Sequence, residues 1–264
     1  MLFPSFRWRI ILIKLLCSIL FCICGLGTLG TELEAYAQVG SSKVPSFREP
    51  LPEMHQRLKG KASSFANLSP AQCRRRLKAH REGPLIFERG KSVRGIATSY
   101  RLLGSRVAID VRVPSKKSEI ALKDCRFLLT WIELVPMLQK HNITAIRFDN
   151  FYRRGAKIRK GKKSQHSYGL AADIGMIQFG EQEVEIKDGF LGKIGSETCG
   201  PEAVLYQANH SELALSGAKK MRDFICDLAR KGSFHHLLTP NYNAAHAEHL
   251  HFDIQRDNRW CFVK

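Results

Sequence analysis

The stretches SQHSYGLAAD, Ser164–Asp173, and HAEHLHFD, His246–Asp253, decide how the C-terminal part of this chain folds. In the first stretch His166 and Asp173 are seven positions apart, with Gly169 between them. On a helix this spacing separates two residues by about 10 Å along the axis, and on a strand it places them on opposite faces. The two side chains therefore meet only if the chain bends, and glycine permits the backbone angles of a bend. We expect His166 on a loop and Asp173 at the start of a strand.

The second stretch predicts a late strand with one histidine face. His249 and His251 are two positions apart, so on a strand both side chains point to the same side. Phe252 and Ile254 then point into the core. In a regular strand Glu248 points away from the histidines and reaches their side only if the chain turns or bulges.

Hydrophobic periodicity predicts the other elements and an α+β fold with an antiparallel sheet and flanking helices. Mixed helices and strands occur without βαβ alternation, which favours this class over a parallel α/β sheet. The predicted elements are a helix with Ser69 as its N-cap and Pro70 at its first position, strand structure within Val93–Val113, a helix over Ser118–Lys140 that Pro136 kinks or ends, a strand beginning at Ile143 and running into a basic loop, a helix over Ser211–Lys231 and a final strand at His249–Ile254.

The N-terminal residues 1–37 have the three parts of a secretory signal peptide. Basic residues up to Lys14 precede an apolar run from Leu15 to about Leu29, and the A-x-A sequence AYA follows at Ala35–Ala37. The apolar run is shorter than the roughly 20 residues of a membrane span. We expect cleavage after Ala37 and export to the periplasm or cell envelope. The alternative is a retained anchor, so any membrane contact is expected through this segment alone.

Residues 38–67 are interpreted as a flexible linker before a domain over 68–264. Pro45, Pro50 and Pro52 fall in this segment among serines and lysines, without sustained periodicity.

The charge balance predicts an anionic partner. The chain has 42 Lys and Arg against 24 Asp and Glu, a formal charge of +18. Such a field attracts nucleic acid, anionic lipids or acidic cell-wall polymers. For an exported protein we expect peptidoglycan or another anionic envelope polymer and no nucleic acid. A secreted nuclease also suits the charge, but the chain has no recognisable nuclease motif.

Five cysteines remain after the signal segment. They form no C-x-x-C pair, which argues against a structural zinc knuckle. In an oxidising compartment, two disulfides and one free thiol are expected, and several pairings satisfy this expectation. The five are Cys73, Cys125, Cys199, Cys226 and Cys261.

The motifs SQHSYGLAADIG and NYNAAHAEHLHFD carry a family resemblance. From about Ser69 to the C-terminus, the chain resembles the extensin-like C-terminal domain proteins of bacteria. These are similar to the zinc D-Ala-D-Ala peptidases, whose fold is of the lysostaphin and hedgehog type. The resemblance implies Zn²⁺ held by His166, Asp173 and His251.

The same resemblance implies catalytic roles for three further residues. Glu248 stands where the D-Ala-D-Ala peptidases have their general base. His249 matches the histidine that lies near the reacting water in the lysostaphin branch. Arg153, with Arg154 beside it, stands where those enzymes place an arginine that contacts the substrate or its developing oxyanion.

The function expected from the sequence is zinc-dependent hydrolysis of peptide bonds in peptidoglycan stem peptides or cross-links, by a metallopeptidase of the endopeptidase or carboxypeptidase type. The alternative is a non-catalytic, zinc-containing module that binds the cell wall. Relatives of the hedgehog type keep zinc without a known need for hydrolysis, so the motifs support metal binding more directly than turnover.

Overall fold

Two β-sheets and several helices build the part of the chain that the computed structural model describes, residues 44–114, 118–158, 161–206 and 209–264. Val44–Lys264 forms one compact unit. The predicted signal peptide, residues 1–37, lies outside the described residues. Within the described ranges, no helix has the length and apolar character needed to cross a membrane.

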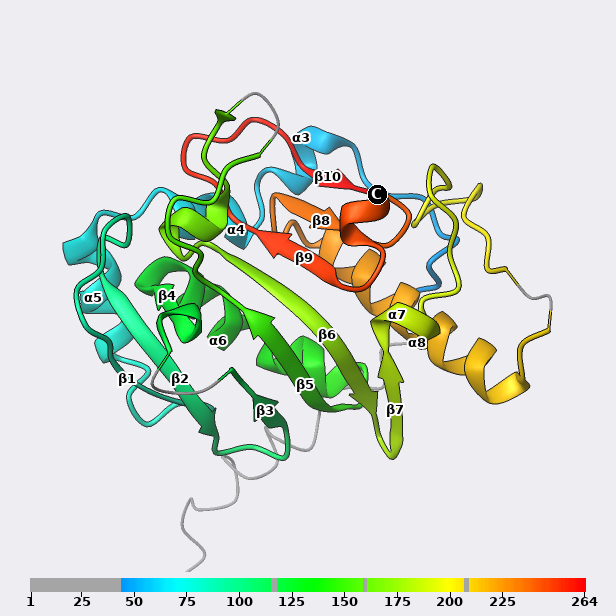
Figure 1. Cartoon of the computed structure of the whole chain (residues 1–264), viewed down its shortest axis with the longest axis horizontal. Helices are drawn as coiled ribbons and strands as arrows, with labels where there is room; N and C mark the ends of the chain where they lie inside the picture. The colour runs from blue at the N-terminus through cyan, green and yellow to red at the C-terminus, as the bar shows by residue number, and fades with distance from the viewer. Residues whose placement is uncertain (1–43, 115–117, 159–160, 207–208) are drawn as a thin grey trace, which may run out of the picture. The chain divides into compact units, whose positions relative to one another are not determined.

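The larger sheet has seven strands and mixed directions (Figure 1). Its order is β10-β8-β9-β6-β5-β3, and β7 pairs with β6. The pairs β10–β8 and β3–β5 are parallel and the others are antiparallel, so the α+β class is confirmed with a mixed sheet. The strands are β3 (Asp110–Arg112), β5 (Ile143–Asn150), β6 (Ala171–Phe179), β7 (Gln182–Glu185), β8 (His236–Leu238), β9 (Leu250–Asp253) and β10 (Phe262–Val263).

The smaller sheet is antiparallel and consists of β1 (Leu85–Arg89), β2 (Ser99–Ser105) and β4 (Leu122–Asp124) in the order β1-β2-β4. The strand structure predicted within Val93–Val113 therefore divides between two sheets, because β2 joins the smaller one and β3 the larger one.

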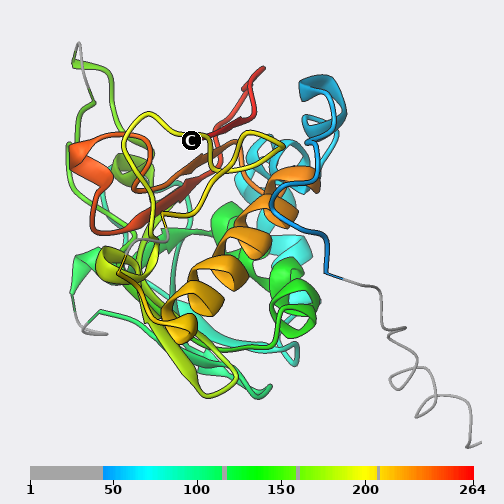
Figure 2. The same cartoon turned by 90° about the vertical axis from the view of Figure 1, so that its right-hand side faces the viewer.

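Helices α6 (Cys125–Lys140) and α8 (Glu212–Arg230) lie behind the large sheet as Figure 1 is viewed, and Figure 2 shows them side by side. Their apolar faces share one core with the inward-facing residues of β5, β6 and β9. The helix starts predicted at Ser69 and Ser211 are confirmed. Ser69 caps α5 (Pro70–Lys78) and Ser211 caps α8 through their side chains. The short helix α7 (Ile186–Gly189) follows β7.

The helix predicted over Ser118–Lys140 begins later than expected. Residues 119–124 form the 3₁₀-helix η1 (Glu119–Ala121) and β4. Pro136 lies inside α6 and does not end it, which leaves a kink as the predicted effect. Pro136 is exposed, so its ring lies on the solvent side of the helix. The buried Leu134, Val135 and Leu138 hold the same turns against the core.

The flexible linker predicted over 38–67 is wrong for residues 44–67. This segment forms α3 (Met54–Arg57) and α4 (Lys61–Ala66) and buries Phe47 and Phe65. The Phe47 amide donates to Asp223 Oδ1 at 2.7 Å, and the Ala62 amide donates to the Gly232 carbonyl at 3.1 Å. The prolines interrupt any periodicity, so only tertiary packing shows that these apolar residues belong to the core.

The cysteines confirm the expectation of two disulfides and one free thiol. Cys73 is bonded to Cys125, which joins α5 to α6, and Cys199 is bonded to Cys226 in α8. Cys261 is free and buried.

Removing the Cys73–Cys125 bond is expected to lower the stability of the folded state substantially. The bond spans 52 residues, and closing such a loop typically contributes about 2–4 kcal/mol, because it restricts the unfolded chain. Chemical denaturation of the Cys73→Ser/Cys125→Ser variant measures this loss. Cys261→Ser, which breaks no bond, is the matched control, and equal losses in both variants would contradict the expectation.

Candidate metal centre

The bend predicted between His166 and Asp173 is present. His166 lies in the 3₁₀-helix η3 (Gln165–Tyr168), which Ser164 caps with its side chain. Gly169 ends this helix with φ of 63°. A Cβ atom there would lie 2.9 Å from the Asp124 backbone nitrogen, so packing also requires a glycine. The chain then enters β6, in which Asp173 is the third residue.

The register of the strands brings Asp173 together with residues from two neighbouring strands. Asp173 on β6 is the direct cross-strand partner of His251 on β9 and of Asn150 on β5. These three residues thus form a row across the sheet. Ile174 and Phe252, the next residue on β6 and on β9, point to the opposite side and are fully buried in the core.

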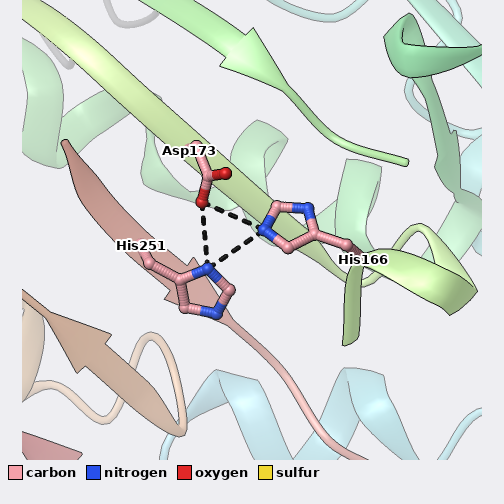
Figure 3. Close-up of side chains that lie close together, drawn as sticks. All are labelled: His166, Asp173 and His251. Carbon is pink, nitrogen blue, oxygen red and sulfur yellow. Dashed lines mark hydrogen bonds and ion pairs between the residues drawn. The ribbon is translucent and has the colours of Figure 1, made fainter. Parts of the chain in front are cut away.

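Three ligand-type atoms converge at this row (Figure 3). Asp173 Oδ1 lies 3.0 Å from His166 Nε2 and 3.0 Å from His251 Nδ1, and the two histidine nitrogens are 3.1 Å apart. Ligand atoms around a tetrahedral zinc ion lie about 3.3 Å apart, since the bonds measure about 2.0–2.1 Å. The three predicted ligands are therefore already spaced for such an ion to within a few tenths of an ångström.

The outer hydrogen bonds of the two histidines determine where their lone pairs point. His166 Nδ1 lies 3.0 Å from the Phe151 carbonyl oxygen, which only accepts, so Nδ1 carries the proton. His251 Nε2 lies 3.2 Å from Asp253 Oδ2, a carboxylate oxygen, and donates to it. In the neutral rings, His166 Nε2 and His251 Nδ1 thus present lone pairs to the Asp173 carboxylate. Such a set requires a positive charge at its centre.

The pKa shifts agree with that requirement. Burial opposes ionisation of Asp173, yet the His166 and His251 rings, 3.0 Å away, hold its pKa well below its ordinary value. Burial also opposes protonation of His251, but hydrogen bonds to Asp173 and Asp253 raise its pKa to about 9. For His166, burial lowers the pKa. Without a metal, a proton on His251 supplies the positive charge, and a metal that binds displaces it.

A second carboxylate, that of Asp253, accepts a hydrogen bond from the His251 ring nitrogen that faces away from Asp173. Asp253 lies two residues further along β9 and accepts from His251 Nε2 through one oxygen. Its other oxygen accepts from His236 Nδ1 at 2.7 Å. The Asn150 amide donates to Asp173 Oδ2 at 2.8 Å. Asp253, His236 and Asn150 are not among the site residues that the sequence motifs predict. Asp253 is two residues from His251, so strand alternation places both side chains on one face, and this spacing could have identified Asp253 from the sequence. His236 and Asn150 are identified only by strand pairing.

Replacing Asp253 with asparagine is expected to weaken zinc binding about 10–100-fold. Asparagine keeps one oxygen that accepts, but its NH2 group cannot accept, so only one of His251 and His236 can still donate to this side chain and the His251 ring loses part of its orientation. Competition with a chelator measures the affinity. The control is Asp188→Asn, which alters an exposed carboxylate in α7. Unchanged affinity in Asp253→Asn would show that the backbone alone orients His251.

Two of the predicted catalytic residues lie beside the three ligands. Arg153 Nη2 is 3.6 Å from Asp173 Oδ2, and 52% of the side chain is exposed. His249 Nε2 is 3.6 Å from Asp173 Oδ1, on the side of β9 where His251 also points. Burial lowers the pKa of His249, which keeps the ring neutral at pH 7. Arg154 turns aside and pairs with Glu119 at 3.6 Å.

Glu248 lies differently from the other predicted residues. It precedes β9, its side chain is 70% exposed, and its carboxylate pairs with Lys187 Nζ at 3.7 Å. This is the orientation that strand alternation predicts for a residue next to His249. The side chain that lies next to Asp173 is that of His249.

An aromatic group borders His249 and His251. The His246 ring lies 5.3 Å from the His249 ring and 5.8 Å from the His251 ring, measured between centroids. Tyr242 stacks edge-on against His246 at 5.3 Å and against Phe262 at 5.7 Å. His246 is in the 3₁₀-helix η4 (Ala244–His246), where burial lowers its pKa to about 4. This group forms one edge of the metal centre.

Comparison with known proteins gives one match. Residues 133–263 match the family described as Extensin-like protein C-terminus. This range contains the whole metal centre, including Asn150, Asp253 and His236, and begins within α6. No curated protein and no solved structure matches the chain. The two sequence motifs predict a resemblance to the extensin-like family, and this match over residues 133–263 supports it.

Proposed function

We propose that this protein is an exported zinc-dependent peptidase that hydrolyses peptide bonds in peptidoglycan stem peptides or cross-links. The observation that carries the proposal is the convergence of His166 Nε2, Asp173 Oδ1 and His251 Nδ1 with their lone pairs directed at one another. Three protein ligands from histidine and carboxylate, with a fourth position left for water, are typical of catalytic zinc. The motif resemblance to the zinc D-Ala-D-Ala peptidases supports the same reaction.

Zinc held by these three atoms would lower the pKa of a bound water and polarise a peptide carbonyl. His249, kept neutral by burial, is placed to accept a proton beside Asp173. Arg153 is half exposed beside the same carboxylate and supplies positive charge where a tetrahedral oxyanion would develop. Asn150 and Asp253 hold Asp173 and His251 in the orientation that this chemistry needs.

The choice of substrate rests on the predicted export and on charge. An exported peptidase in the periplasm or cell envelope meets peptide bonds in the stem peptides of peptidoglycan. The formal charge of +18 favours retention on an anionic polymer.

The experiment that tests the proposal is digestion of purified peptidoglycan by the full chain. We expect mass spectrometry to find stem-peptide fragments that have gained one water, which disappear with a chelator and return when zinc is added. If the wild-type chain bound no zinc, the assignment of the three residues as a metal centre would be contradicted. Zinc binding without any cleaved fragment would contradict the peptidase assignment.

The exposure of Glu248 favours one alternative. The residue that stands where related peptidases have their base pairs with Lys187 instead. If His249 does not replace it, the protein is a zinc-containing module that binds the wall without cleaving it. Cosedimentation with peptidoglycan, together with zinc binding and no cleaved fragment, is the result that this alternative predicts.

A further inference from the structure

A hairpin leaves the surface between Arg153 and Ser164 and projects away from the sheets (Figures 1 and 2). Lys157 and Lys163 pair as an isolated antiparallel bridge, and the Ile158 amide donates to the Lys162 carbonyl at 2.7 Å. Residues 159 and 160 lie outside the described part of the chain. The hairpin thus has a hydrogen-bonded frame.

Both ends of this hairpin are attached to the metal centre. At one end the Arg153 amide donates to the His166 carbonyl at 3.1 Å, while the Arg153 side chain lies beside Asp173. At the other end Ser164 caps the 3₁₀-helix that carries His166, and its amide donates to Ala156 at 2.9 Å. A polymer lying along the hairpin is therefore led to the three ligands.

The charge of the hairpin is of one sign. Residues 153–163 contain seven Lys and Arg and no Asp or Glu. Lys157, Lys162 and Lys163 are exposed, and none of them forms an ion pair with another described residue. The side chain of Ile158 is 55% exposed between them. Cations that no carboxylate neutralises are available to an external anion.

The basic surface continues beside the base of the hairpin. Arg94 is exposed, and its carbonyl accepts from Tyr152 Oη at 2.7 Å, which fixes that segment next to Arg153. Exposed Lys91 pairs with Glu119, which also pairs with Arg154. Among the described residues, Arg94, Lys157, Lys162 and Lys163 form no ion pair, and Arg153 pairs with Asp173.

We infer that the two described arms of this hairpin, residues 153–158 and 161–164, form the docking surface for peptidoglycan, and that they bind the carboxylates of the stem peptides next to the bond presented to the metal centre. The choice of partner rests on the proposed function, but binding to the hairpin requires no metal.

The test is cosedimentation of the full chain with purified peptidoglycan sacculi. The variant is Lys157→Gln/Lys162→Gln/Lys163→Gln, and its control is Arg74→Gln/Arg75→Gln/Lys78→Gln, which removes three exposed charges from α5. We expect the hairpin variant to bind about tenfold more weakly, since each exposed pair contributes a modest free energy. The control should change by less than about threefold. Amidation of the sacculus carboxylates should abolish wild-type binding.

Chelated protein and His251→Ala separate this inference from the proposed function. Both should still bind sacculi through the hairpin, even if no peptide bond is ever cleaved. Equal losses in the two triple variants would overturn the inference, as would undiminished binding to amidated sacculi. If sacculus binding is unchanged in the hairpin variant while binding to duplex DNA is lost, the surface serves nucleic acid and the assigned partner is wrong.

Discussion

His251→Ala is expected to weaken zinc binding about a hundred- to a thousandfold, so that dialysis against a chelator chosen to leave about one zinc per wild-type chain removes the zinc from the variant. His251 supplies one of three converging protein atoms, and its ring is 9% exposed, so no external group takes its place. Zinc sites in small domains bind with about 10–16 kcal/mol. If four bonds share this energy, the loss of one weakens binding by a factor of about a hundred to a thousand. Elemental analysis of the purified full chain measures the ratio.

Two further variants make this result specific. His246→Ala removes a histidine whose ring lies 5.8 Å from that of His251 and should leave one zinc per chain. His251→Gln keeps most of the side-chain volume and should lose zinc without forming a cavity in the folded protein. If wild type binds no zinc when zinc is supplied, or if His251→Ala still binds one ion, the metal centre is assigned wrongly.

His249→Ala is expected to lower peptidase activity about 10²–10⁴-fold, the usual contribution of a general base. His249 is proposed for this role because its Nε2 lies 3.6 Å from Asp173 Oδ1. Glu248→Ala is expected to stay within about twofold of wild type, as is usual for an exposed side chain whose ion pair is on the surface. The measurement is the rate of fragment release from peptidoglycan at saturating zinc.

The two variants are matched, because they are neighbours and each removes one ionisable group. Zinc content must remain near one ion per chain in both, so that a lost rate reports proton transfer and not an empty site. The opposite result, an inactive Glu248→Ala and an active His249→Ala, would show that the turn before β9 rearranges when substrate binds. Glu248 would then be the base that its sequence position predicts.

Sequence periodicity predicted several elements because each depends on local contacts. The caps Ser69 and Ser211 satisfy amide groups of their own helices, and Gly169 provides a bend whose backbone angle few other residues adopt. The same reasoning failed for residues 44–67, where the helices are short and Phe47 and Phe65 are buried by distant parts of the chain. Periodicity also does not show whether Pro136 ends its helix or lies within it, since exposure of that residue is a property of the tertiary fold.

The sequence by itself determined the bend at His166 and Asp173, the strand with His251, and the orientation of Glu248 away from the histidines, because each follows from the fixed periodicity of the backbone. Only the tertiary structure decided that β5, β6 and β9 are neighbours in a register that aligns Asn150, Asp173 and His251. Strand pairing also brought His236 to Asp253. Contacts between residues distant in sequence depend on the packing of the whole core, which no local pattern encodes.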